Sequence, residues 1–176
     1  MFSPFIRYIA NEQHYADVVQ EITKLKHDVW IGTSDIKDMY IKRNNVEIPF
    51  LKILAELLDR KVNVRLIHAK EPGPNFRKDF DKYPALIKGL ERVLCPRVHF
   101  KLIIFDLHTV YIGSANLTGA GLGMKSKDNR NFESGILTND PEIVAKAIDQ
   151  YDNVWMGKYC PSCNRKTFCG DRIDMI

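Results

Sequence analysis

The chain has 176 residues, a formal net charge of +4 and an isoelectric point near 8.8. Hydrophobic residues make up 45% of it and charged residues 27%, as in an ordinary soluble domain with a core of its own. It has no apolar run of about 18 residues and no basic and apolar N-terminal signal, so we expect no membrane span and a cytoplasmic location. The mild basic excess permits a nucleic-acid partner without requiring one.

Helical and extended patterns alternate along the chain, which predicts an α/β fold with a mixed β-sheet flanked by helices on both faces. Asp140, Pro141 and Glu142 form an N-cap, a first-turn proline and an acidic first turn, so they predict where the last helix begins. In chain order we expect a helix over 12–27, a strand over 29–32, a helix over 48–60, a strand over 62–68, a partly helical stretch over 75–93, strands over 98–105, 110–114 and 132–138, and a helix over 140–155.

The pair of strands at 98–105 and 110–114 carries the most informative residues. His99 and Lys101 are two apart and therefore share a face of a strand, as do Ser114 and Asn116. Folded as a hairpin, the two strands can present all four side chains to one place. This set suits an anionic phosphodiester, because Lys supplies charge, Ser and Asn position oxygens, and His can attack or move a proton.

Asp106 stands at the end of the first of these strands. Its parity is opposite to that of His99 and Lys101, so on a regular strand it faces away from them. We therefore expect a turn residue whose carboxylate accepts backbone N–H groups of the turn, not a general base.

The spacing of these residues is H-x-K-x4-D-x6-G-S-x-N, and it resembles the motif of the phospholipase D superfamily. Family members usually carry a Glu on a following strand, often after an Asn, and Glu133 after Asn131 fits that place. The resemblance implies that His99 attacks phosphorus and forms a phosphohistidine, that Lys101 and Asn116 hold phosphoryl oxygens, and that Glu133 orients the imidazole. It implies no metal ion for catalysis. The matching motif positions are His99, Lys101, Asp106, Gly113, Ser114 and Asn116.

Enzymes of this family use two such motifs, and this chain has one complete copy. The other H-x-K, at His68 and Lys70, has Asn75 in place of the Asp and no Gly-Ser after it. We expect His68 to be a strand-end residue near the surface. The single-motif branch of the family builds its site across a two-fold homodimer, so the resemblance implies a homodimer here.

The segment 119–130 looks like a phosphate-binding loop at first sight. The Walker pattern requires a Gly directly before the Lys, and Met124 stands there instead. We expect a loop beside the active site. Its basic residues Lys125, Lys127 and Arg130 either are simply solvated or follow the phosphate backbone of a substrate.

Three of the four cysteines lie near the C-terminus. Cys160 and Cys163 form a C-x2-C pair with Cys169 beyond it, which predicts a structural zinc site in a tail at 159–176 that follows a catalytic domain at 1–158. The fourth ligand stays open among Cys95, His14, His27, Asp171 and a residue of a partner chain. The alternative is a set of reduced cysteines without metal.

The sequence thus favours a metal-independent phosphodiesterase, most simply a nuclease that cleaves nucleic acid. A phospholipid phosphodiesterase or phosphatidyl transferase is the first alternative, and a nucleic-acid-binding module with a relic site is the second. The sequence does not separate DNA from RNA or single from double strands.

Overall fold

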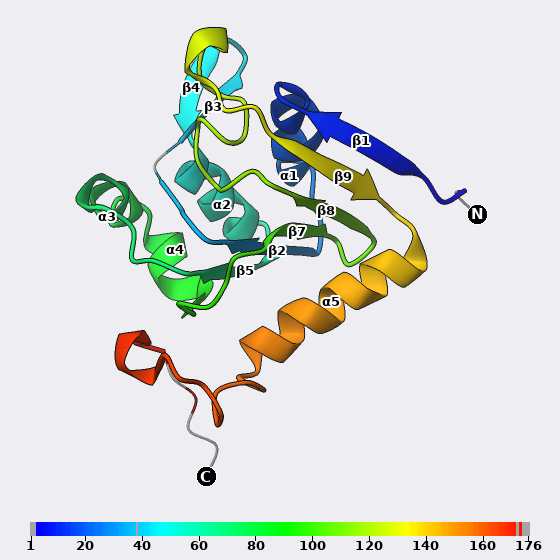
Figure 1. The fold of residues 1–176 in the computed structure, drawn as a ribbon. Helices are drawn as coiled ribbons and strands as arrows, with labels where there is room; N and C mark the ends of the chain where they lie inside the picture. Colours follow the sequence, from blue (N-terminus) through cyan, green and yellow to red (C-terminus); the bar gives the residue numbers. More distant parts are fainter. Residues whose placement is uncertain (1–2, 38, 172, 174–176) are drawn as a thin grey trace.

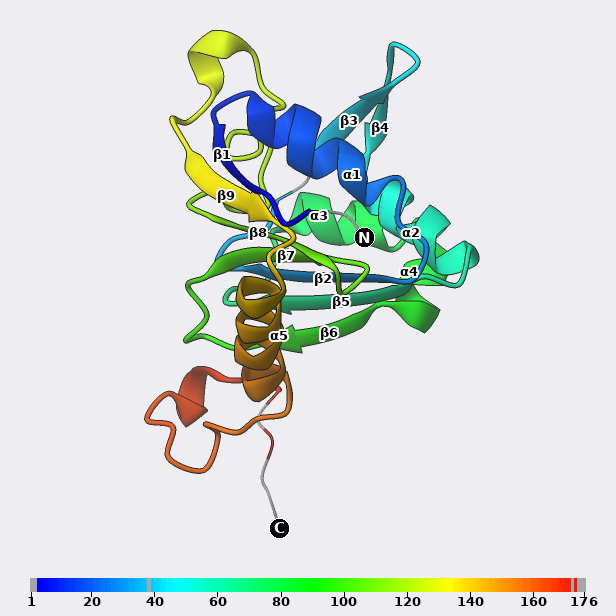
Figure 2. The same ribbon diagram turned by 90° about the vertical axis from the view of Figure 1, so that its right-hand side faces the viewer.

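The computed structural model describes residues 3–37, 39–171 and 173. At its centre is a seven-stranded sheet in the order β1-β9-β8-β7-β2-β5-β6 (Figure 2). Strands β2, β5 and β6 are parallel, whereas β7, β8, β9 and β1 continue the sheet as antiparallel neighbours, so the predicted mixed sheet is confirmed. The strands are β1 (Ile6–Ala10), β2 (Asp28–Thr33), β5 (Asn63–His68), β6 (Glu91–Leu94), β7 (Lys101–Phe105), β8 (Thr109–Gly113) and β9 (Ser134–Thr138).

Helices cover both faces of the sheet, and each face has its own hydrophobic core (Figures 1 and 2). Alternate residues of β2 divide between them: Val29 and Ile31 join one core and Trp30 the other. The second face is covered by α5 (Pro141–Trp155). The first core contains residues of η1 (His14–Val19), α1 (Gln20–Ile22), α2 (Phe50–Asp59), α3 (Pro74–Phe80) and α4 (Pro84–Gly89). Among the described residues, no helix is long and apolar enough to cross a membrane.

The last helix begins as predicted. The Asp140 side chain accepts hydrogen bonds from the N–H groups of Glu142 at 3.0 Å and Ile143 at 3.1 Å, and the helix runs from Pro141 to Trp155. Two 3₁₀ turns, η2 (Lys127–Asn129) and η3 (Lys166–Phe168), complete the helical elements. The N-cap chemistry is local, which is why the sequence alone was sufficient to locate this helix start.

Several other boundaries differ from the expectation. The helix expected over 12–27 covers only 14–22. The partly helical stretch expected over 75–93 instead ends in strand β6, which pairs with β5 in parallel. Strand β1 and the hairpin of β3 (Tyr40–Arg43) and β4 (Val46–Pro49) were not predicted. The sequence carries a signal for this hairpin in the pair Asn44 and Asn45, because a two-residue hairpin turn requires positive φ and Asn tolerates it. In the structure these residues have φ of 53° and 61°.

His68 is not near the surface, contrary to the expectation. It ends β5 between β2 and β6, opposite Thr33 and Leu94, and its side chain is fully buried. Its Nδ1 lies 2.6 Å from the Lys70 carbonyl oxygen. Burial lowers the pKa of His68, and the Lys70 carbonyl opposes this only in part, so the imidazole is a neutral core group.

Asp106 fixes the hairpin of β7 and β8 to the start of β2. Asp106 and Leu107 form the turn, with φ of 46° and 53°, so the expected turn position is correct. The partners differ from the expectation: the carboxylate accepts the N–H groups of Lys26, His27 and Asp28, at 2.8 Å from His27 and 2.9 Å from Asp28, instead of those of its own turn. Partial burial alone raises the pKa of Asp106, but these three N–H groups together bring it below its usual value.

We predict that Asp106→Asn lowers the free energy of unfolding at pH 7 by about 1–2 kcal/mol, because it weakens charge-assisted hydrogen bonds while Asn still tolerates positive φ. The folded-state pKa of Asp106 is depressed, so its contribution is complete above the unfolded-state pKa of about 3.9 and disappears as the pH falls through the folded-state value. Urea unfolding at several pH values from 7 to 3.5 should show that the difference in unfolding free energy between wild type and Asp106→Asn becomes smaller as the pH falls. Asp149→Asn, on the exposed side of α5, is the control. Equal stabilities at pH 7 would contradict the prediction.

Candidate functional site

The motif residues lie at one edge of the sheet, where strands running in opposite directions begin and end. Lys101 opens β7 opposite Gly113 at the end of β8, and Gly113 in turn lies opposite Gly135 near the start of β9. On the other side of β7, β2 pairs Gly32 with Leu102 and ends one residue later. Residues far apart in the sequence are thereby gathered along one border of the fold.

His99 and Lys101 are direct neighbours at this edge. The strand begins at Lys101, so His99 precedes it, and the His99 side chain is exposed. Lys101 is only 9% exposed, and its Nζ donates to the His99 carbonyl oxygen at 2.8 Å. The same Nζ lies 3.4 Å from Nδ1 and 3.5 Å from Nε2 of the His99 ring. Within the described part of the chain no carboxylate pairs with Lys101, so a largely buried ammonium faces the imidazole without a counter-ion.

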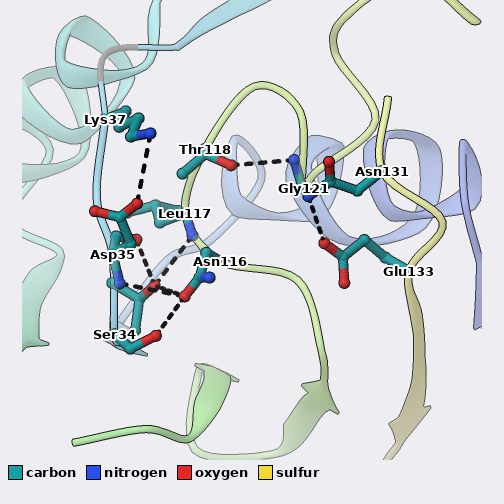
Figure 3. Close-up of polar contacts among 10 residues, drawn as sticks. Ser34, Asp35, Lys37, Asn116, Leu117, Thr118, Gly121, Asn131 and Glu133 are labelled. Atoms are coloured by element: carbon teal, nitrogen blue, oxygen red, sulfur yellow. Dashed lines mark hydrogen bonds and ion pairs between the residues drawn. The ribbon is translucent and has the colours of Figure 1, made fainter. Parts of the chain in front are cut away.

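Asn116 is held by a polar turn that follows β2 (Figure 3). Its Oδ1 accepts from Ser34 Oγ at 2.8 Å and from the Asp35 N–H at 3.2 Å, while Thr33 Oγ1 accepts the Leu117 N–H at 3.1 Å. Because donors surround Oδ1, its Nδ2 group is the part of the amide that remains available to a ligand. Sequence reasoning missed Ser34 and Asp35, although three polar residues directly after a buried strand were a readable signal.

Glu133 belongs to a second polar group beside the end of β8. Ser114 Oγ donates to Glu133 Oε2, and Asn131 Nδ2 donates to Oε1 at 3.0 Å (Figure 3 shows the Asn131 contact). Ser114 Oγ in turn accepts the Ser134 N–H at 3.0 Å. The carboxylate is therefore oriented by Ser114 and Asn131, and the described hydrogen bonds do not join it to His99. Its role in orienting the imidazole stays a prediction.

Gly113 is explained by what lies beneath it. A Cβ at this position would come within 2.2 Å of Tyr111 Oη, so the backbone passes too close to the ring for any side chain. Tyr111 is fully buried and meets the His14 ring edge-on, with 5.4 Å between centroids and an interplanar angle of 83°. Burial lowers the pKa of His14, although the Asn11 carbonyl and Glu133 oppose it, and burial also raises the pKa of Tyr111. The floor of the site is therefore an uncharged aromatic layer.

The basic loop residues separate in the structure. Arg130 makes an ion pair with Glu12 at 3.6 Å, whereas Lys127 is exposed in η2. Lys125 lines a groove beside the hairpin of β3 and β4. The structure thus does not bring all three residues to one place, and their contact with a substrate stays a prediction.

All four cysteines line one cavity of about 240 Å³ between the start of the motif segment and the tail. Of the fourth-ligand candidates, Cys95 lies in this cavity, and Asp171 accepts the N–H of Leu94 next to it at 2.7 Å. His14 belongs to the aromatic floor, and His27 lies at the Asp106 end of the sheet. In the described part of the chain, however, no group of three or more His, Cys, Asp or Glu side chains is close enough to hold a metal ion as it stands.

Comparisons with known proteins agree with this architecture. NucT from Helicobacter pylori is 18% identical, with a TM-score of 0.61, over 86% of this chain and 95% of that one. Nuc from Salmonella typhimurium, described as a phospholipase D family member, is 19% identical, with a TM-score of 0.61, over 87% and 95%. Phosphatidylserine synthase from Haemophilus influenzae Rd KW20 is 14% identical, with a TM-score of 0.61, over 85% of this chain but 38% of its own.

No curated protein matches the sequence significantly. A family model described as "Cardiolipin synthase, PLD-like domain" matches residues 18–155, a range that includes every position of the motif and Glu133. The match covers well over half of the chain and agrees with the mixed sheet, the placement of the motif at its edge and the structural neighbours. The chain therefore belongs to the phospholipase D-like family.

Proposed function

We propose that this protein is a metal-independent nuclease that cleaves phosphodiester bonds through a phosphohistidine intermediate, at a site completed by a second copy of the chain. The observation that carries the proposal is the pair of Lys101 and His99. A largely buried ammonium without a carboxylate partner in the described chain is costly unless an anion joins it, and it lies within 3.5 Å of an exposed imidazole. A phosphodiester oxygen supplies that anion and places phosphorus beside the ring.

The proposed reaction has two steps. In the first, a ring nitrogen of His99 forms a bond to phosphorus while the bond to the leaving oxygen breaks, and His99 of the second copy donates a proton to that oxygen. In the second, the latter His99 takes a proton from water, whose oxygen displaces the first imidazole from phosphorus. Lys101 and the Nδ2 group of Asn116 would hold the non-bridging oxygens, where charge accumulates in both transition states.

Nucleic acid is favoured over phospholipid by the structural matches and by charge. The match covers 95% of the length of Nuc and of NucT, but only 38% of phosphatidylserine synthase. Its net charge is +4. Cleavage of labelled DNA and RNA strands, compared with hydrolysis of phosphatidylcholine vesicles, separates the two classes. Binding without cleavage would instead indicate a binding module. The cytoplasmic location stays a prediction.

We predict that His99→Ala abolishes cleavage and that Lys101→Ala lowers the turnover rate by about 10²–10³-fold, as the loss of one oxyanion-stabilising group does. His108→Ala in the hairpin turn and Lys88→Ala on α4, both exposed positions, are the controls and should cleave normally. Added chelator should leave the wild-type rate unchanged, because the imidazole, not a metal-bound water, attacks phosphorus. Near-normal turnover by His99→Ala would overturn the mechanism.

The second copy has a surface to occupy next to the site. Tyr8 on β1, Ile136 on β9 and Ile112 on β8 form one row across three strands, and they are 67%, 42% and 41% exposed. Ser134 follows on the same face and bonds to Ser114. An apolar row on a sheet face is unusual in a monomer. Pairing this row with itself about a two-fold axis would bring together the ends of β8 and β9 beside which Ser114 and Glu133 lie.

We predict that the wild type sediments as a dimer and that Tyr8→Glu sediments as a monomer with little activity, because a charge is then buried in the pairing surface. Ile87 on α4 is about as exposed as Tyr8 but lies outside the row. The control variant Ile87→Glu should therefore remain dimeric and active. When excess His99→Ala protein is allowed to exchange subunits with the wild type, the activity should fall below the value expected from dilution of the wild type alone. A fully active monomer at the same concentration would refute the shared site.

We also propose that the four cysteines bind a structural zinc ion. Three features support this: all four line one cavity, the Cys163 N–H donates to the Cys160 carbonyl at 3.2 Å in a tight turn, and the Arg165 N–H points at Cys163 Sγ at 3.4 Å. That N–H and the charge of Arg97 lower the pKa of Cys163, which favours the thiolate. The thiols would have to close around the ion, since they are not yet grouped tightly.

We predict about one equivalent of zinc per chain in protein purified without chelator, and a loss of at least half of it in Cys95→Ser, because the site would lose one of four thiolates. Ser162→Ala, between the paired cysteines, should keep its zinc. Elemental analysis measures both. Less than about a third of an equivalent in the wild type would reject the site, and full retention by Cys95→Ser would exclude Cys95 as a ligand.

A further inference from the structure

A groove of about 600 Å³ lies between the β3–β4 hairpin and the loop that follows Asn116. Tyr40, Lys42 and Glu47 line it from the hairpin, and Thr118 and Lys125 line it from the loop. Its volume is that of a site for a small ligand or a nucleotide-sized part of a larger one. Neither the motif nor the proposed chemistry at His99 uses it.

The groove continues from the catalytic edge through a short backbone connection. The N–H of Asp35 donates to Asn116 Oδ1 at 3.2 Å, and two residues later the N–H of Lys37 donates to the Leu117 carbonyl at 3.1 Å. Figure 3 shows Lys37 and Thr118 beyond Asn116, on the side away from Ser34. Both residues line the groove. Only a few residues of the protein therefore separate Asn116 from the groove, so a nucleic-acid strand bound at Asn116 would reach it.

The groove combines positive charge with an aromatic surface. Lys37, Lys42 and Lys125 are basic, and Glu47 is the acidic residue among those described as lining it. Lys37 pairs with Asp35 at 3.6 Å, whereas no ion pair within the described residues involves Lys42 or Lys125. Tyr40 is 44% exposed, so part of its side chain faces solvent. Lysines along a path with an exposed aromatic ring form the pattern that binds single-stranded nucleic acid.

One wall of the groove is held in place before any ligand arrives. Tyr15 Oη accepts the N–H of Lys42 at 2.8 Å and donates to the carbonyl of the same residue at 3.2 Å. These two bonds fasten strand β3 to η1. The backbone that carries Tyr40 and Lys42 is thereby preorganised, which reduces the entropy lost on binding.

We propose that this groove is a subsite for single-stranded nucleic acid, in which a base next to the scissile phosphate stacks on Tyr40 while Lys42 and Lys125 contact backbone phosphates. The inference rests on the proposed nuclease function and names its substrate class. Bases of a duplex are stacked on each other and cannot stack on Tyr40. A phospholipid would offer a phosphate but no base for the ring.

The test measures binding separately from cleavage. A labelled oligonucleotide of about a dozen residues, a length within the range of single-strand sites, is titrated into His99→Ala protein, as a single strand and as a duplex, by fluorescence anisotropy. In the His99→Ala protein, the further substitution Tyr40→Ala should weaken binding of the single strand about tenfold. Tyr40→Phe should keep the affinity, since stacking needs the ring alone. Adding Lys42→Gln should lower the slope of log Kd against log salt by about 0.7, and Lys88→Gln should not.

Equal single-strand affinity with Tyr40→Ala, or tighter binding of the duplex than of the single strand, would overturn the proposal. Binding to anionic phospholipid vesicles in place of the oligonucleotide would overturn it as well. If the His99→Ala protein binds the single strand through Tyr40 but the wild type does not cut it, the subsite stands and the nuclease function fails. A small chromogenic phosphodiester, which has no base beside its phosphate, gives a second readout: the ratio of oligonucleotide cleavage to hydrolysis of this compound should fall in Tyr40→Ala and stay unchanged in Lys88→Gln.

Discussion

The register between β2 and the β7–β8 hairpin is the constraint on which the site depends. It places Gly32 opposite Leu102 and Lys101 opposite Gly113, so the polar turn after β2 lies beside the start of β7. At the far end, the Asp106 carboxylate accepts N–H groups at the start of β2 and prevents a slip. Because side chains alternate along a strand, a slip of one residue would move Lys101 to the other face of the sheet. The Asp of the motif thus serves the site from its opposite end.

The site is built from separate small groups instead of one continuous network. Lys101 is held by His99, Asn116 by the turn at Ser34 and Asp35, and Glu133 by Ser114 and Asn131. Each group holds its own side chain by hydrogen bonds within the group and leaves some donor groups free, such as Nδ2 of Asn116. A phosphodiester has several oxygens around one phosphorus, and it would be the ligand that joins these groups.

The two faces of the sheet differ in how completely they are covered. Several helices pack on one face, whereas on the other face α5 covers the middle of the sheet, and the row of Tyr8, Ile112 and Ile136 remains exposed. This asymmetry follows from the connections. The crossovers between the parallel strands bring helices to the sheet, whereas the antiparallel strands β7, β8 and β9 are joined without an α-helix between them. The uncovered row ends one residue before Gly113 of the motif, on the face of the sheet opposite to the Lys101 side chain.

The sequence by itself determined the motif, the mixed α/β architecture and the start of α5, because residue identity, alternation and N-cap chemistry act over a few residues. It did not determine β1, β6 or the interior position of His68, because strand pairing and burial are set by partners distant in the chain. Ser34 and Asp35 became part of the site only when β2 was placed beside β7. Likewise, only the fold brought Cys95 into one cavity with the tail cysteines and Lys125 into one groove with the β3–β4 hairpin, since each is lined by segments that no local pattern connects.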